Sequence, residues 1–200
     1  ISVLWLSAAY IFLFQRNLLA KLNQIVFANI LNVYNFWQIH NGQSYFERFA
    51  ANESPFTNLW TMSIEGQFYI VWPIVIFLLV KFAKKKKNIF WILMGLSIAS
   101  AIMMTSLYLL KADINRIYYG TDTRFFSLGL GAALAVIWPV EKLNTNIRKK
   151  YTIILDVTGF VSFALLILMY FSKLMDPQQA FTYCGGMLLF TLDVCIFAAV

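Results

Sequence analysis

The 200-residue chain has few charged residues. They make up 12% of the sequence, whereas a soluble domain typically has about 25%. Hydrophobic residues account for 60% and aromatic residues, chiefly Phe, for 18%. A chain of this composition cannot keep its apolar surface away from water by folding alone, but a lipid bilayer removes that requirement. The scarcity of charge excludes a soluble domain and indicates an integral membrane protein.

Cysteine and histidine are almost absent, with two Cys and one His. Cys184 and Cys195 lie in one apolar segment, and on a helix they would be roughly 16 Å apart, too far for a disulfide. The single histidine, His40, allows neither a Ser/His/Asp triad nor a histidine metal site. The sequence also has no Gly-rich phosphate loop and no basic nucleic-acid patch. We therefore expect no bound metal, no bound cofactor and no nucleic-acid partner.

Seven apolar segments divide the chain. A helix that spans a bilayer takes roughly 20 mostly apolar residues. The second segment is the weakest because it carries Lys21 and several amide side chains, so we expect it to pack inside the bundle or to lie in the interface. The fold class predicted is all-α, a polytopic transmembrane bundle of about seven helices. The segments are about 1–14, 18–37, 60–82, 89–110, 124–140, 152–171 and 183–200.

Basic residues occur in every second loop. The run Lys84–Lys87 follows the third segment, and four basic residues between positions 142 and 150 follow the fifth. The alternate loops, including residues 40–58 and 111–122, mix acidic and basic residues. This alternation follows the positive-inside rule, by which the basic loops lie in the cytoplasm. It supports counting the weak second segment as a span, and it places the 40–58 loop outside the cell membrane.

The third segment differs from a plain apolar span. Ser63, Glu65 and Gln67 lie within its first two turns, and an acidic residue at the centre of a spanning helix costs about 2.5–3.5 kcal/mol. At helical spacing Glu65, Tyr69 and Trp72 share one stripe, while Ser63 and Gln67 share another. The polar side chains therefore predict a functional or helix-joining role.

This segment carries a family signature. The pattern Trp60-x-x-Ser63-x-Glu65-x-Gln67-Phe68-Tyr69-x-x-Trp72-Pro73 resembles that of the acyltransferase-3 family of membrane O-acyltransferases. Three other stretches match the family in order and spacing. They are the lead-in Asn35–Trp37, the following Ser44–Phe46 and the later helix Asp122–Ala132, which contains Arg124.

The resemblance implies an enzyme that takes an acyl group, usually acetyl, from cytoplasmic acyl-CoA. It delivers that group to a hydroxyl of a glycan on the far side of the membrane. The Lys-rich inner loops are similar to those of the peptidoglycan O-acetyltransferases of Gram-positive bacteria. The partners implied are acyl-CoA, a cell-surface glycan and the bilayer, in a multi-pass protein of the bacterial plasma membrane. We expect residues 1–200 to be part of a single transmembrane domain that lacks its N-terminal helices and C-terminal end.

The resemblance also implies site residues. Glu65 is the catalytic candidate, orienting or deprotonating a histidine or holding the acceptor hydroxyl; the alternative is a structural Glu that ties two helices together. Arg124 holds a phosphate, a carbonyl or a developing oxyanion, or else it is a snorkelling interface arginine. The substrate-binding candidates are Asn58, Trp60, Ser63, Gln67, Tyr69 and Arg124.

The chain departs from the family at several positions. Asn58 stands where the family has a histidine, and Gly66 stands where it has a second acidic residue. The family's catalytic histidine lies in a first spanning helix that these 200 residues do not include, and His40 does not match it. We therefore expect the 200 residues alone to be inactive.

Other side chains allow a rival function. A proline-kinked helix at Pro73 and the intramembrane residues Asp156 and Asp193 would also suit a proton-coupled transporter or a glycan flippase. Asp156 could instead pair with Arg148 or Lys149, whereas Asp193 has no obvious partner. A non-catalytic sensor or accessory subunit is a third alternative, which holds if the longer protein has no catalytic histidine.

Tryptophans and small residues predict anchoring and packing. Trp residues near segment ends are typical of interface anchors, and small residues allow helices to approach closely. The anchors expected are Trp5, Trp37, Trp60, Trp91 and Trp138, and the small residues are Gly129, Gly131, Ala132, Ala133, Gly185 and Gly186.

Overall fold

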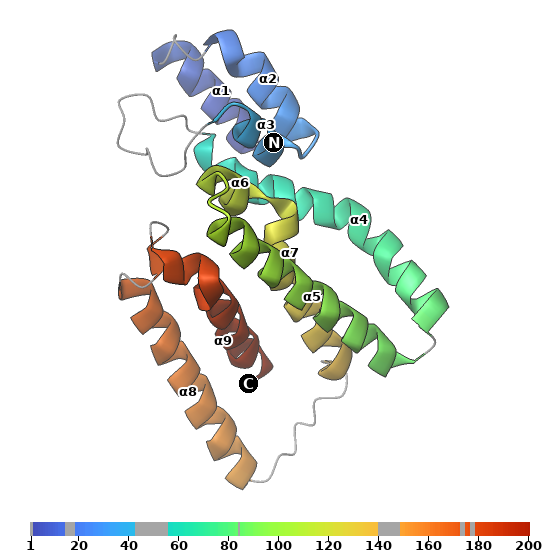
Figure 1. Ribbon diagram of the computed structural model, residues 1–200. Coiled ribbons are helices and arrows are strands. Elements are labelled where there is room, and N and C mark those ends of the chain that lie inside the picture. Colours follow the sequence, from blue (N-terminus) through green and yellow to red (C-terminus); the bar gives the residue numbers. More distant parts are fainter. Residues whose placement is uncertain are drawn as a thin grey trace. The chain divides into compact units, whose positions relative to one another are not determined.

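The computed structural model describes residues 2–14, 19–42, 56–83, 85–139, 149–172, 175–176 and 179–200 (Figure 1). Within these ranges every regular element is a helix, and no strand occurs. The all-α fold class predicted from composition and segment lengths is thus confirmed.

The chain forms two compact units. The first comprises Ile1–Phe77 and Asp113–Thr121, and the second comprises Leu78–Ala112 and Asp122–Val200. The first contains α1 (Ser2–Phe14), α2 (Leu19–Ile30), α3 (Tyr34–His40), the 3-10 turn η2 (Thr57–Leu59), the start of α4 (Trp60–Ala83) and α6 (Ile114–Tyr119). The second contains the end of α4, α5 (Lys86–Leu109), α7 (Thr121–Ile137, whose first residue belongs to the first unit), α8 (Lys149–Phe171), the π-helical turn η5 (Thr182–Gly186) and α9 (Met187–Ala199).

Among the described residues, four helical stretches are long and apolar enough to cross a membrane. They are Thr57–Ala83, Lys86–Leu109, Thr152–Phe171 and Thr182–Ala199. At 1.5 Å per residue each is close to or above the roughly 30 Å of a bilayer core. The first runs without interruption through Pro73. These stretches support the membrane bundle predicted from the apolar segments.

The weak second segment is not one helix. It is divided into α2 and α3, of 12 and 7 residues. Asn32 adopts a left-handed φ of 56°, the Val33 N–H donates to the Ala28 carbonyl at 2.8 Å, and the Asn32 N–H donates to the Asn29 carbonyl at 3.1 Å. This is a Schellman helix end, for which Asn is a suitable residue. Neither helix alone is long enough to span the bilayer core.

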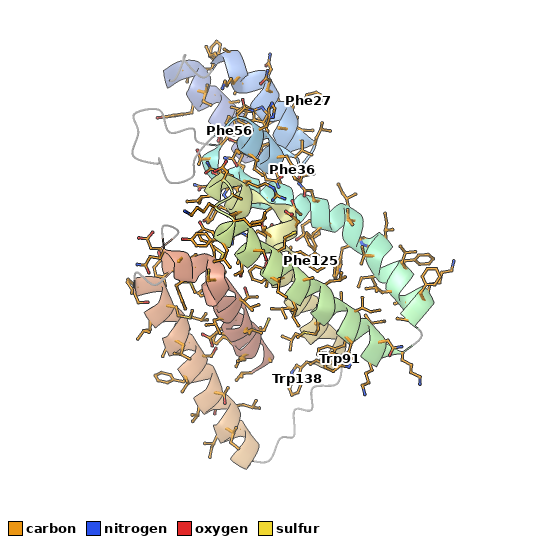
Figure 2. The ribbon with its side chains drawn as sticks, in the orientation of Figure 1. Phe27, Phe36, Phe56, Trp91, Phe125 and Trp138 are labelled. Carbon is orange, nitrogen blue, oxygen red and sulfur yellow. The ribbon has the colours of Figure 1, made fainter. Side chains whose placement is uncertain are left out.

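The first unit has its own apolar core. The fully buried side chains include Ile11 on α1, Ile25 on α2, Tyr34 on α3 and Phe56 before η2. Phe27 and Phe36 point away from α2 and α3 (Figure 2), with 66% and 49% of their surface exposed. Helices α2 and α3 therefore leave these two rings outside the core of the first unit.

In the second unit, α5 and α7 approach closely. The Ser100 hydroxyl donates to the Asp122 carbonyl at 2.5 Å and accepts from the Phe126 N–H at 3.2 Å. One turn further along α7, a Cβ placed on Gly129 would lie 2.2 Å from Oγ of Ser97. A Cβ on Gly131 would meet nothing within 4 Å. Of the two glycines on α7 that were predicted to allow close packing, Gly129 is therefore the one that does.

These glycines give a matched test of α5–α7 packing. We expect Gly129→Val to lower the free energy of unfolding by about 1–3 kcal/mol, as is typical of overpacking. Gly131→Val, on the open side of the same helix, should change it by no more than about 0.5 kcal/mol. The thermal midpoints of the two variants in detergent measure the difference. Equal midpoints would show that α5 and α7 do not approach at Gly129.

Helices α8 and α9 lie side by side in the second unit (Figure 1). The Ser162 hydroxyl donates to Oδ1 of Asp193 at 2.5 Å and lies 3.0 Å from the Asp193 carbonyl oxygen. The rings of Phe163 and Phe197 stack with centroids 5.8 Å apart. The expectation that Asp193 has no partner is wrong, because a serine on the neighbouring helix supplies one. Asp156 is exposed, while Arg148 and the side chain of Lys149 lie outside the described residues.

The last apolar segment is broken at η5. Gly185 has a φ of 125°, a conformation that suits glycine, and Cys184 also departs from helical angles. The Tyr183 carbonyl accepts a hydrogen bond from the Thr105 hydroxyl at 3.1 Å. Its ring stacks on Tyr108 at 5.1 Å. A side chain and a ring of α5 therefore compensate for the interrupted helix, as backbone at membrane depth requires.

The tryptophans predicted as anchors differ in exposure, and Trp37 is partly buried against the core of the first unit. Trp5, Trp91 and Trp138 are 73%, 61% and 46% exposed, and Figure 2 shows Trp91 and Trp138 in the second unit. These exposures fit interface anchors. Trp60 is only 7% exposed and belongs to the core of the first unit. The prediction that Trp60 is an interface anchor is wrong, since its ring is covered by protein.

Candidate active site on helix α4

The signature residues at the start of α4 divide between two faces. Trp60, Ser63 and Ile64 are buried in the first unit, and Gln67 is partly buried. They follow the spacing i, i+3, i+4, i+7 of one helix face. Glu65 is exposed. It lies about 200° from Gln67 around the helix, at 100° per residue. The two stripes predicted from the spacing are therefore an inner face and an open face.

Trp60 is held on the inner face by aromatic side chains of α6. Its ring centroid lies 5.1 Å from that of Tyr118 and 5.3 Å from that of Tyr119, the latter edge-to-face. Such pairs contribute about 0.5–1.5 kcal/mol beyond the burial of their surface. Tyr119 is fully buried. Trp60, predicted to bind substrate, therefore packs α4 against α6.

Gln67 is the centre of a polar network in the first unit. Its Nε2 donates to the Asn32 carbonyl at 2.6 Å and to Oδ1 of Asn35 at 2.9 Å. Its Oε1 accepts from the Thr121 hydroxyl at 2.7 Å. Nδ2 of Asn35 donates to Oγ1 of Thr121 at 2.9 Å and to the Tyr119 carbonyl at 3.0 Å. We call the three connected side chains the Gln67–Asn35–Thr121 ring. A sugar hydroxyl would have to displace one of these bonds to reach the Gln67 amide hydrogens.

Gly66 provides the space for the end of α2. The Asn32 carbonyl is one of the groups that a helix end leaves without a partner inside the helix, and Gln67 satisfies it. A Cβ on Gly66 would lie 2.2 Å from Oδ1 and 2.4 Å from Cγ of Asn32. Such distances require a side chain to move. The departure from the family at position 66 therefore has a physical reason, because Asn32 occupies the space.

The open face carries the candidate catalytic carboxylate. Glu65, Asn58 and Tyr69 are exposed, Tyr69 at 78%. No hydrogen bond or ion pair joins the Glu65 carboxylate to the described residues. A structural Glu that ties two helices together would have such a bond, so within these residues this alternative has no support. An ionisable group on a spanning helix is costly unless it meets a partner or water, which favours a site role for this face.

Arg124 belongs to the second unit. Its Nη1 donates to Sδ of Met187, the first residue of α9, at 3.0 Å. The Arg124 carbonyl accepts from the Ser127 hydroxyl at 2.9 Å. The side chain is half-buried. It therefore lies at the broken part of the last apolar segment, where α9 begins after η5.

Asn35 and Thr121 were not predicted as site residues. Asn35 belongs to the family lead-in and is one of the amide side chains of the weak second segment, and an amide in an apolar segment is itself a signal. Thr121 gave no signal, because a lone threonine at a helix start is common. The other lead-in, Ser44–Phe46, lies outside the described residues. No group of three or more metal-ligating side chains comes together in the part of the chain that the structure describes.

In sequence, the chain is similar to proteins named as bacterial O-acetyltransferases. The chain is 38% identical over 179 residues, 90% of its length, to the peptidoglycan O-acetyltransferase OatA of Listeria monocytogenes. It is 36% identical over 195 residues, 96% of its length, to the putative peptidoglycan O-acetyltransferase YrhL of Bacillus subtilis. It is 37% identical over 175 residues, 87% of its length, to the O-acetyltransferase OatA of Staphylococcus aureus.

The match covers only part of each relative. The chain spans 28% of the Listeria and Staphylococcus proteins and 30% of the Bacillus protein. No family model matches the chain, and no solved structure matches it. The three relatives confirm the resemblance to cell-wall glycan O-acetyltransferases that the sequence signature indicated.

Proposed function

We propose that the chain is part of an enzyme that acetylates a cell-wall glycan. Over about 90% of its length it is homologous to part of the peptidoglycan O-acetyltransferases. The observation that carries this proposal is the level of identity, 36–38%, to three O-acetyltransferases. All three relatives are named as acetyltransferases, so they give no support to the transporter or flippase alternative.

The donor proposed is acetyl-CoA from the cytoplasm. A hydroxyl oxygen of the sugar attacks the thioester carbonyl, the C–O bond forms and the C–S bond breaks. The hydroxyl proton leaves through a base, and coenzyme A departs as its thiol. The residues proposed for these steps are Glu65 at the proton, acting directly or through a histidine elsewhere in the longer protein, and Asn58 and Tyr69 beside it on the open face of α4. Arg124, which follows the loop at the other end of α5 from the lysine turn, is proposed to bind the carbonyl oxygen of the acetyl group or the oxyanion that develops on it.

The protein is proposed to lie in the bacterial plasma membrane, with its basic loops in the cytoplasm. Lys85, Lys86 and Lys87, at the turn from α4 to α5, are exposed. This turn joins two of the stretches long enough to span the bilayer. Exposed lysines at such a turn fit the cytoplasmic side. An enzyme of this topology has its donor on one side and its glycan on the other.

The test is incorporation of label from radiolabelled acetyl-CoA into peptidoglycan by membranes that contain the full-length protein. We expect alkali-labile label in the glycan, because an O-acetyl ester is cleaved by base, and none in membranes without the protein. Absence of label at confirmed expression, with free acetyl-CoA still present, would overturn the proposal.

A further inference from the structure

The Gln67–Asn35–Thr121 ring is closed, and every polar hydrogen in it is used. Both hydrogens of Nε2 of Gln67 are donated, one to the Asn32 carbonyl and one to Asn35. Both hydrogens of Nδ2 of Asn35 are donated, one to Thr121 and one to the Tyr119 carbonyl. The single Thr121 hydrogen goes to Oε1 of Gln67. The ring has no donor left for another group.

This arrangement accepts only one orientation of each amide. If the Gln67 amide were turned over, its oxygen would face the Asn32 carbonyl and its nitrogen would face a hydroxyl that already accepts from Asn35. Two acceptors would then oppose each other without a proton between them. Asn35 is fully buried, so solvent does not reach its amide to replace a lost bond. The ring therefore has one stable geometry.

The ring joins segments that are far apart in the sequence. Asn35 comes from α3, Gln67 from α4 and Thr121 from the first residue of α7, directly after α6. The ring contacts of Trp60 with Tyr118 and Tyr119 on the same face tolerate small rotations of the helix. Hydrogen bonds weaken steeply when their angles change. The Gln67–Asn35–Thr121 ring is thus a directional contact that restricts the rotation of α4 about its axis.

We infer that Asn35 and Thr121 are positioning residues that act on Glu65 through Gln67. Because Glu65 lies on the opposite face of the same helix turn, fixing Gln67 fixes the direction in which the Glu65 carboxylate points. A small rotation of α4 would move the carboxylate away from the atoms on which it acts, and misplacement by about 1 Å can cost about 100-fold in rate. This inference rests on the proposed function for its kinetic part, but the rotation of α4 can be tested without it.

The rotation is tested with Thr121→Val, which has nearly the same shape as threonine but no hydroxyl. The reporter is a thiol at Ser63→Cys, since Ser63 is 2% exposed on the inner face, in full-length protein whose other cysteines are replaced. We expect Thr121→Val to raise the rate of maleimide labelling at position 63 at least about fivefold. Thr121→Ser, which keeps the hydroxyl, should restore protection.

Thr158→Val is the matched control, because the Thr158 hydroxyl bonds only the Ile154 carbonyl of its own helix at 2.8 Å. It should leave the labelling rate unchanged. Equal labelling of Thr121→Val and the Thr158 control, with both proteins folded by their thermal midpoints, would overturn the inference. If Thr121→Val does not fold, Thr121→Ala in the same assay decides the question.

The kinetic arm measures acetyl transfer by the same variants without the reporter thiol. We expect Thr121→Val to lower kcat about 10-fold or more while KM for acetyl-CoA stays within about twofold, and Thr121→Ser to restore kcat. An increase in KM for acetyl-CoA with kcat unchanged would contradict a positioning role. If the wild type transfers no acetyl group, the proposed function fails, whereas the labelling arm still decides whether the ring fixes α4.

Discussion

Glu65→Gln is expected to reduce acetyl transfer by the full-length protein about 100-fold or more. Glutamine keeps the size of the side chain and its ability to accept a hydrogen bond, but it cannot take up a proton. General acid–base catalysis contributes typically 10²–10⁴-fold, so losing the base should cost at least the lower figure. The measurement is the rate of label transfer from acetyl-CoA to peptidoglycan at equal expression.

The position of Glu65 makes this variant informative. The carboxylate is exposed and makes no bond to the described residues, so its loss should leave the thermal midpoint close to that of the wild type. Asp156→Asn is the matched control, since Asp156 is also an exposed carboxylate on an apolar helix. It should retain activity. Wild-type rates in Glu65→Gln would show that this carboxylate takes no part in the transfer.

Gly66→Glu, which introduces the acidic residue of the acyltransferase-3 pattern, is expected to destabilise the protein rather than to improve it. A Cβ at position 66 would lie 2.2 Å from Oδ1 of Asn32. The new side chain must push the Asn32 amide away, and this disturbs the packing of the end of α2 against α4. Overpacking costs typically 1–3 kcal/mol.

The measurement is the yield of monodisperse protein and its thermal midpoint in detergent. Gly95→Glu tests whether a new carboxylate on a spanning helix is harmful by itself, because a Cβ on Gly95 meets nothing within 4 Å. Gly66→Ala, which adds only the clashing atom, should lower the midpoint, whereas Gly95→Ala should raise it slightly, as replacing an interior helix glycine does. A higher midpoint in Gly66→Ala would mean that Asn32 does not occupy this space.

The division of the α4 signature residues between two helix faces could be predicted from the sequence. Helical spacing alone separated Glu65 and Tyr69 from Ser63 and Gln67, and the structure places these two pairs on an open and an inner face. Spacing did not say which face is which. In a soluble helix the polar side faces water, but lipid is as apolar as a protein interior, so the distribution of hydrophobic residues does not distinguish the two faces.

The break between α2 and α3 was only partly visible in the sequence. The amide-rich segment was recognised as weak, and Asn32 is a residue that tolerates a left-handed conformation. Several other asparagines in the same segment have the same property. The turn forms at Asn32 because its carbonyl accepts a hydrogen bond from the Gln67 amide, 35 residues later, and its side chain fits over Gly66.

The sequence by itself determined the class of the molecule, because composition and segment length alone require helices in a bilayer. It also indicated the resemblance to membrane O-acyltransferases, because the signature is a local pattern, and the relatives named as O-acetyltransferases agree with it. Only the tertiary structure decided that Trp60 is a core residue, that Gly129 but not Gly131 makes a helix contact, and that Asn35 and Thr121 meet Gln67. The physical reason is that a hydrogen bond between residues 86 positions apart, such as that of Asn35 with Thr121, depends on how whole helices dock. Local periodicity specifies the faces of each helix but not their partners.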